Sequence, residues 1–209
     1  MQTKQTVAVI GATGNMGSAI SRNLSKGNYR LLLKANDQKK LQALIKDIKS
    51  SNRAADVEAM ECPRDASWEA DIIIAAVPYA AEKEVAEKIR EVANQKVVIS
   101  IANPLNETYN GLVTSSDTSA AEELQKLLPH SKVVKAFNTT FASDFSTPIV
   151  NGKQTDAFIA GNDDEAIQTV SELVSTAGFN PIIAGNLSVS RKLENMQLLR
   201  IQERMSSKQ

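Results

Sequence analysis

The sequence predicts an α/β fold in which helices cover both faces of a doubly wound, mostly parallel sheet, followed by a C-terminal helix. One observation is that short, continuous apolar runs alternate with segments in which apolar residues recur every three or four positions. Such runs are typical of strands buried on both faces, and the recurring spacing is typical of amphipathic helices. A second observation is a glycine-rich turn directly after the first apolar run.

The expected strands are the apolar runs, and the one at 71–77 is the strongest. In chain order they lie at residues 7–10, 29–33, 57–60, 71–77, 97–99, 132–137, 156–160 and 181–184. Because helical patterns separate most of them, these strands are expected to form a parallel sheet covered on both faces.

The helices are expected from their apolar faces and from the residues that begin them. Asp37 is placed to cap one helix, and Ser119 with Glu122 has the spacing of a capping box. Acidic residues at 163–165 favour the start of another helix, and the last helix is expected over about 188–205. The apolar positions of the earlier helices span residues 16–24, 41–48, 81–92, 124–128 and 167–177.

The composition is that of a globular protein and excludes several classes. Lysine and arginine together number 24, equal to aspartate plus glutamate, which argues against a nucleic-acid or anionic-membrane surface. Cys62 and His130 are the sole cysteine and histidine, so no metal site is expected. The longest apolar run, 72–78, is far shorter than the ~20 residues of a membrane span. We expect a cytoplasmic protein with a single domain over 1–209.

Gly11, Gly14 and Gly17 form the pattern G-x-x-G-x-x-G between a strand and a helix. Glycine allows the backbone to approach a pyrophosphate, and the helix N-terminus offers unpaired N–H groups and a positive dipole end. This context is typical of a Rossmann-type dinucleotide-binding domain, although a tight turn without a ligand is the alternative. The residues expected to bind the dinucleotide here are Gly11, Thr13, Gly14, Asn15, Met16 and Gly17.

The residues after the second strand bear on the choice between NAD and NADP. An acid at that position binds the ribose 2′-hydroxyl of NAD, whereas a basic residue suits the 2′-phosphate of NADP. Asp37 is the only acid nearby, and its position favours a helix cap over a ribose ligand. Lys34, Lys39 and Lys40 are placed to serve a phosphate or to lie solvated on the surface. The sequence favours NADP and leaves NAD open.

Tyr79 and Lys83 match the Y-x-x-x-K pair of short-chain dehydrogenases, in which the lysine lowers the pKa of the tyrosine. In that family the pair follows the fifth strand, whereas here it opens the helix after the fourth strand. We therefore expect Tyr79 to lie at the mouth of a nicotinamide site without acting as a catalytic acid. Residues 102–117, the longest irregular segment, are a candidate site loop.

Several segments occur in an order that spans nearly the whole chain: the opening loop at 9–17, Pro78, and residues 101–105, 132–140, 160–165 and 184–191. Together these motifs resemble the coenzyme F420-dependent NADP oxidoreductase family. The chain differs from the family pattern at Ala35 and Asn36, where the family has Ser-Arg, and at Asn138, where it has histidine. The segment 137–139 is also similar to ferric-reductase oxidoreductase domains, which use a flavin.

The resemblance implies an enzyme that passes a hydride directly between NADP(H) and the deazaflavin F420, or a flavin. Because that step needs no side chain to transfer a proton, no catalytic residue is expected. NADP would lie past the second strand near Lys34, Asn36 and Lys40, with its nicotinamide near Val77, Pro78 and Tyr79. The second ring would lie against Asn103, Pro104, Phe137, Asn138 and Thr139.

The family is dimeric, which makes a homodimer the expected assembly, with small redox cofactors as the partners. Two other functions stay open from the residues alone. One is an oxidoreductase that uses another small-molecule acceptor, and the other is a dinucleotide sensor without enzymatic activity.

Overall fold

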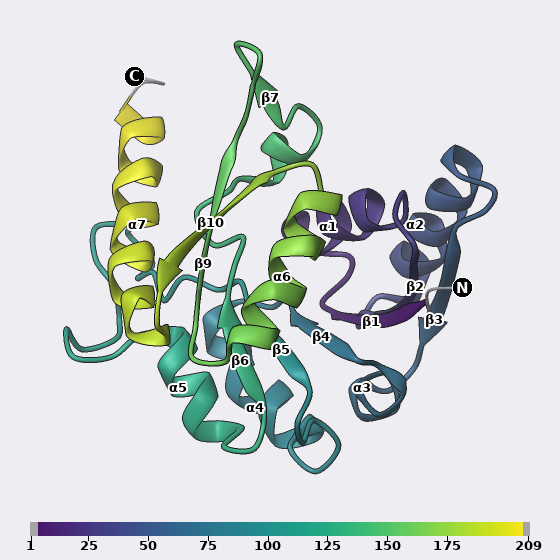
Figure 1. Ribbon diagram of the computed structural model, residues 1–209, viewed down its shortest axis with the longest axis horizontal. Coiled ribbons are helices and arrows are strands. Elements are labelled where there is room, and N and C mark those ends of the chain that lie inside the picture. The colour runs from purple at the N-terminus through teal and green to yellow at the C-terminus, as the bar shows by residue number, and fades with distance from the viewer. Residues whose placement is uncertain (1–3, 207–209) are drawn as a thin grey trace.

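Eight strands form the central sheet of the computed structural model, which describes residues 4–206 (Figure 1). From one edge to the other they are β10 (Asn180–Gly185), β9 (Asp156–Gly161), β6 (Lys132–Lys135), β5 (Val97–Ser100), β4 (Ile72–Ala75), β1 (Gln5–Ile10), β2 (Tyr29–Lys34) and β3 (Asp56–Met60). The six strands from β6 to β3 pair in parallel. The predicted mostly parallel, doubly wound sheet is confirmed.

Helices cover both faces of this sheet. One face carries α1 (Asn15–Leu24), α2 (Gln38–Ser51) and α6 (Asp164–Thr176). The other face carries α3 (Pro63–Glu69), α4 (Tyr79–Ile89) and α5 (Ala120–Leu127). The predicted C-terminal helix is α7 (Ser190–Ser206), which lies at the β10 side of the molecule in Figure 1.

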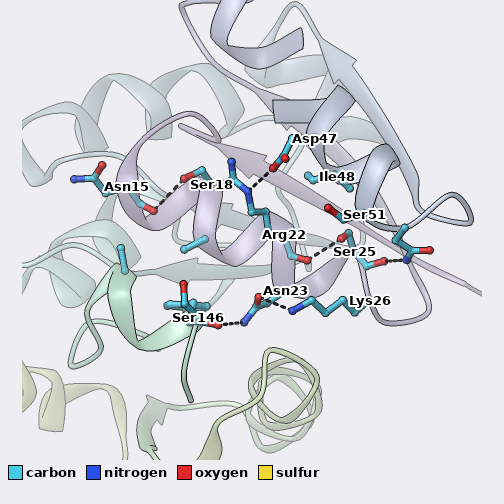
Figure 2. Close-up of a pocket in the computed structure, with 14 residues that line it drawn as sticks. Asn15, Ser18, Arg22, Asn23, Ser25, Lys26, Asp47, Ile48, Ser51 and Ser146 are labelled. Atoms are coloured by element: carbon cyan, nitrogen blue, oxygen red, sulfur yellow. Dashed lines mark hydrogen bonds and ion pairs between the residues drawn. The ribbon is translucent and has the colours of Figure 1, made fainter. Parts of the chain in front are cut away.

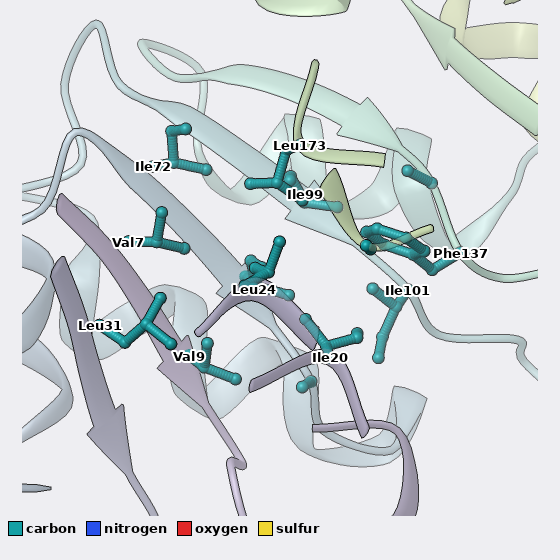
Figure 3. Close-up of a cluster of buried hydrophobic side chains, with 14 of the residues drawn as sticks. Val7, Val9, Ile20, Leu24, Leu31, Ile72, Ile99, Ile101, Phe137 and Leu173 are labelled. Atoms are coloured by element: carbon teal, nitrogen blue, oxygen red, sulfur yellow. The ribbon is translucent and has the colours of Figure 1, made fainter. Parts of the chain in front are cut away.

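Side chains alternate between two apolar cores along each buried strand. In β1, Val7 and Val9 belong to the core under α1, α2 and α6, whereas Ala8 and Ile10 belong to the core under α3, α4 and α5. Figure 3 shows the first core, in which Val7 and Val9 lie with Ile20 of α1. Full burial of one such aliphatic side chain stabilises the fold by about 1.5–3 kcal/mol. Both cores, one on each face of the sheet, therefore contribute to stability.

The predicted caps at Asp37 and Ser119 are confirmed, and Asp163, at the predicted acidic helix start, also caps its helix. Each cap satisfies an N–H group that the helix leaves unpaired. Asp37 accepts a hydrogen bond from the backbone N–H of Lys40 at the start of α2. Ser119 accepts from Glu122 at the start of α5, and an Asp163 side-chain oxygen accepts from the first turn of α6.

The expectation of parallel pairing is wrong at one place, because β6 pairs with β9 antiparallel while β9 and β10 are parallel to each other. Strand β6 also ends before the predicted 137, since Phe137 adopts a left-handed backbone conformation with φ of 59° that no strand accommodates. A short hairpin of β7 (Ile149–Val150) and β8 (Lys153–Gln154) then precedes β9. This hairpin and α3 were not expected from the sequence, because both are too short to show a clear apolar period.

Two short 3₁₀ helices, η1 (Ala142–Phe145) and η2 (Leu187–Val189), connect the larger elements. Over residues 4–206, none of the helices combines the length and apolar character that a membrane crossing requires.

Asn23, labelled in Figure 2, joins α1 to two distant segments, and its removal tests that junction. Its buried amide nitrogen donates to the carbonyls of Phe145 and Ala177, at 2.9 Å each. Asn23→Ala should lower the free energy of unfolding by about 2–3 kcal/mol, measured by urea denaturation, because both carbonyls lose their donor. Asn94→Ala, in which the lost side chain is exposed, should change it by less than about 0.5 kcal/mol. Equal losses would contradict this role of Asn23.

Candidate functional site

A groove of about 400 Å³ lies at the carboxyl ends of β1, β2 and β4. In parallel α/β sheets, ligands bind at this edge where the strand order reverses, as it does on either side of β1. Predicted site residues that line the groove are Gly11, Thr13, Gly14, Lys34, Asn36, Lys40, Val77 and Pro78. These residues come from segments that are far apart in the sequence, but they lie close together in the fold.

The first and third glycines are required by the fold itself. Gly11 has φ of 92°, and a Cβ atom there would lie 2.2 Å from the Ala76 carbonyl oxygen. A Cβ atom at Gly17 would lie 2.3 Å from the Gly11 carbonyl oxygen. Because glycine has no Cβ atom, the loop can lie against the end of β4, and α1 can lie against the loop.

Gly14 has a different role, because its backbone conformation is open to any residue. Its φ is −67°, it is exposed, and a Cβ atom would meet its nearest neighbour, the Gly11 oxygen, at 3.3 Å. The space beside Gly14 therefore belongs to the groove rather than to the packed core.

The N-terminus of α1 faces the same region and has no side-chain cap. Gly14 is its N-cap residue and the first turn contains no acidic side chain. The N–H groups of Asn15, Met16 and Gly17 occupy the first turn, where a helix leaves its donors unpaired. Such a helix end attracts a negatively charged ligand group.

Lysines surround the end of the groove that follows β2. The Lys34 ammonium donates to the Ala35 carbonyl at 2.7 Å, and Lys40 is exposed with its ammonium 3.6 Å from Asp37. The Lys40 backbone N–H lowers the pKa of the Asp37 carboxyl, which agrees with its role as a cap. Lys39 does not line the groove. The arrangement offers two cations next to Asn36, which suits a phosphate.

A second cluster of predicted residues lies in the loops after β5 and β6. The Asn103 amide nitrogen donates to the Asn138 carbonyl at 2.9 Å, and the Asn138 amide nitrogen donates to Asn103 Oδ1 at 2.9 Å. Asn138 Oδ1 and the Thr139 hydroxyl oxygen are buried and have no hydrogen-bond partner in the described part of the chain. Buried polar atoms without partners are where a polar ligand would gain hydrogen bonds.

Two members of this cluster are buried in the protein interior. The Phe137 ring is wholly buried and packs against Phe145 and Phe179, with ring centroids 5.7 and 6.2 Å away. The whole residue, backbone included, has no exposed surface, so the expectation that Phe137 contacts the second ring is not supported by its position. Pro104 is also buried, within the segment 102–117 that was expected to form a site loop.

Tyr79 is not brought into the groove. Its hydroxyl donates to Glu123 of α5 at 2.5 Å and lines a separate cavity between α4 and α5. Burial, followed by the Glu123 carboxylate, raises the pKa of Tyr79 to about 12. This is the opposite of the lowered pKa that a Y-x-x-x-K catalytic pair requires, so the hydroxyl stays protonated.

A further predicted site residue lies outside the groove, and several residues that line the groove were not predicted. Asn15 lines a cavity of about 540 Å³ beside α1, α2 and η1, and Figure 2 shows this cavity with its Arg22–Asp47 ion pair. The α4 residues Ala81, Val85 and Lys88 line the groove, although the sequence analysis did not include them. Their spacing of three or four after Pro78 places them on one helix face, which was the available signal.

Among residues 4–206, no His, Cys, Asp and Glu side chains gather in a group that could hold a metal ion.

Comparison with known proteins relates the chain to one group. A family model described as "NADP oxidoreductase coenzyme F420-dependent" matches residues 6–104. The F420-dependent NADP reductase of Methanocaldococcus jannaschii is 30% identical over 199 residues, covering 90% of this chain and 87% of that protein. Human metalloreductase STEAP2 is 27% identical over 195 residues, covering 93% of this chain and 36% of that protein.

The fold is shared with solved structures as well. A crystal structure from Arthrobacter sp. FB24 has a TM-score of 0.80 and 24% identity, covering 96% of this chain and 93% of that one. This likeness confirms the predicted Rossmann-type fold.

Glu82 makes stability depend on pH. Its carboxylate is buried on α4 and accepts from the Ser100 hydroxyl at 3.1 Å, and burial raises its pKa from 4.5 to about 7. The folded chain therefore keeps a proton that the unfolded chain releases, so this group's contribution to stability falls as pH rises from about 4.5 to about 7. Glu82→Gln, which mimics the protonated acid, should match wild type near pH 4.5 and exceed it by roughly 3 kcal/mol near pH 8.

Urea denaturation at both pH values measures this difference. The matched control is Glu84→Gln on the same helix, since the exposed Glu84 carboxylate has its pKa lowered by Lys88 and should show no such gain. A Glu82→Gln advantage that does not grow with pH would contradict the assignment.

Proposed function

Because the chain belongs to the coenzyme F420-dependent NADP oxidoreductase family, we propose that it transfers a hydride between NADP(H) and coenzyme F420. The resemblance that the motifs indicated is thereby confirmed, and the chain is an NADP-dependent oxidoreductase. One observation supports the placement of this reaction. The groove beside the glycine loop ends at Val77 and Pro78, at the same edge of the sheet as the Asn103–Asn138 loops.

The dinucleotide half of the site uses backbone and lysine groups. We propose that the pyrophosphate lies beside Gly14, where the first-turn N–H groups of α1 are directed. Lys34 and Lys40 then bind the 2′-phosphate of NADP, and Thr13 also lines the groove. The nicotinamide lies at Val77 and Pro78, directly after β4, while α4 excludes water from one side.

The acceptor half uses the loops after β5 and β6. F420, when bound, supplies a deazaflavin ring carbon that accepts or returns the hydride. The residues fit a ring with a polar edge, because Asn138 Oδ1 and the Thr139 hydroxyl are buried without partners among the described residues. Phe137 and Pro104 are buried in the same two loops, and Asn103 holds Asn138 in place. These residues bind and orient the ring, and none needs to transfer a proton in the hydride step.

A flavin is the second candidate acceptor. The segment Phe137–Asn138–Thr139 resembles ferric-reductase domains, which use a flavin, whereas the F420-dependent family has histidine at position 138. We also propose that the chain acts as one domain and as a homodimer. Exposed apolar side chains support the dimer, since Ile183 of β10 and Leu199 and Met205 of α7 are at least half exposed.

Titration of the purified protein tests the reaction and both cofactors. NADPH should bind at least about tenfold more tightly than NADH, and addition of F420 should oxidise bound NADPH, followed by absorbance. FMN in place of F420 separates the two acceptors. Nucleotide binding without reduction of either acceptor would exclude the hydride-transfer proposal and leave only the dinucleotide site.

Gly14→Val tests the position of the pyrophosphate. The variant should fold, because Gly14 has an ordinary backbone conformation, yet it should bind NADPH at least about tenfold more weakly because the side chain fills the groove. Gly17→Ala is the contrast, since its Cβ atom would collide with the Gly11 carbonyl and lower the melting temperature. Normal NADPH binding by a folded Gly14→Val protein would place the pyrophosphate elsewhere.

A further inference from the structure

Lys135, the last residue of β6, is wholly buried and forms an ion pair that joins β6 to three other parts of the chain. Its ammonium lies 2.6 Å from Glu194 Oε1 of α7 and also donates to the Ala102 carbonyl in the loop after β5. The second Glu194 oxygen accepts from the backbone N–H of Ala120, at the start of α5, at 3.1 Å. A single buried pair therefore connects β6, α5, α7 and the loop after β5.

Stability alone does not explain a pair in this position. Both side chains have no exposed surface, and the free energy lost on desolvating two charges offsets most of their attraction. Apolar side chains of similar volume commonly hold such a place equally well. What an apolar side chain cannot do is donate hydrogen bonds to a loop carbonyl.

The carbonyl that Lys135 binds is next to the proposed acceptor site. Ala102 directly precedes Asn103, and Asn103 exchanges hydrogen bonds with Asn138, three residues beyond Lys135. One lysine thus belongs to the strand that carries Asn138 and holds the loop that carries Asn103. Helix α7 adds a second contact to the same region, because Arg200 donates to the Thr139 carbonyl.

We infer that Lys135 is a positioning residue for the acceptor ring. It fixes Asn103 against Asn138 through the Ala102 carbonyl, and Glu194 of α7 holds its ammonium in place. This role rests on the proposed function, in which those two loops bind F420. The dinucleotide groove shares none of these residues, so NADPH binding does not depend on Lys135.

The test compares Lys135→Met with the double variant Lys135→Met/Glu194→Gln. The single variant leaves a buried carboxylate without a cation and should unfold at a markedly lower urea concentration. The double variant removes both charges, and its amide oxygen still accepts from Ala120, so stability should largely return. F420 binding should stay at least about tenfold weaker in the double variant, with NADPH binding within about twofold of wild type.

Hydrogen–deuterium exchange over residues 101–106 gives a readout that needs no F420. Exchange there should be faster in the double variant than in wild type, because the Ala102 carbonyl has lost its donor. The matched control, Lys4→Met/Asp56→Asn, removes a half-exposed pair at 3.0 Å and should match wild type in all measurements.

The outcomes separate the two proposals. A stable double variant with wild-type F420 affinity and unchanged exchange over 101–106 would overturn the role of Lys135. A wild-type protein that neither binds nor reduces F420 would overturn the proposed function. In that case the exchange measurement still decides whether Lys135 positions the loop.

Discussion

The backbone contact between the glycine loop and the end of β4 is the constraint on which the rest of the site depends. Gly11 lies so close to the Ala76 carbonyl, and Gly17 to the Gly11 carbonyl, that neither position has room for a side chain. This packing fixes where α1 begins and therefore where its free N–H groups point. It also brings Val77 and Pro78, which follow Ala76, to the same groove as the loop. The groove and the uncapped helix end beside it thus follow from one steric requirement.

The two halves of the proposed site are built in different ways. The dinucleotide half comes from consecutive strands and from helix ends, so it depends on local backbone geometry. The acceptor half comes from two loops and from α7, which are separated by long stretches of sequence and are joined by the buried Lys135–Glu194 pair. Substitutions in the proposed acceptor half are therefore expected to leave the nucleotide groove intact, because the groove shares none of its residues.

Sequence reasoning found the features that local chemistry determines. The caps at Asp37, Ser119 and Asp163 were predictable because each depends on a hydrogen bond within three residues. The groove residues were predictable because strand ends in a parallel sheet share one edge. The antiparallel β6–β9 pairing, the burial of Lys135 and the direction of the Tyr79 hydroxyl were not, because each is decided by packing between distant elements. Asn103 and Asn138 lie together as the family resemblance implied, although their hydrogen bonds could not be read from the sequence.

Phe137 meets two demands that few amino acids satisfy together. Its left-handed backbone turns the chain from β6 toward Asn138, at a cost of about 1–2 kcal/mol for a residue with a Cβ atom. Its ring is also wholly buried against Phe145 and Phe179. Glycine would relieve the backbone but empty the core, and asparagine would suit the backbone but bury an amide. Few replacements at this position can therefore keep both the turn of the chain after β6 and the packing of the three phenylalanine rings.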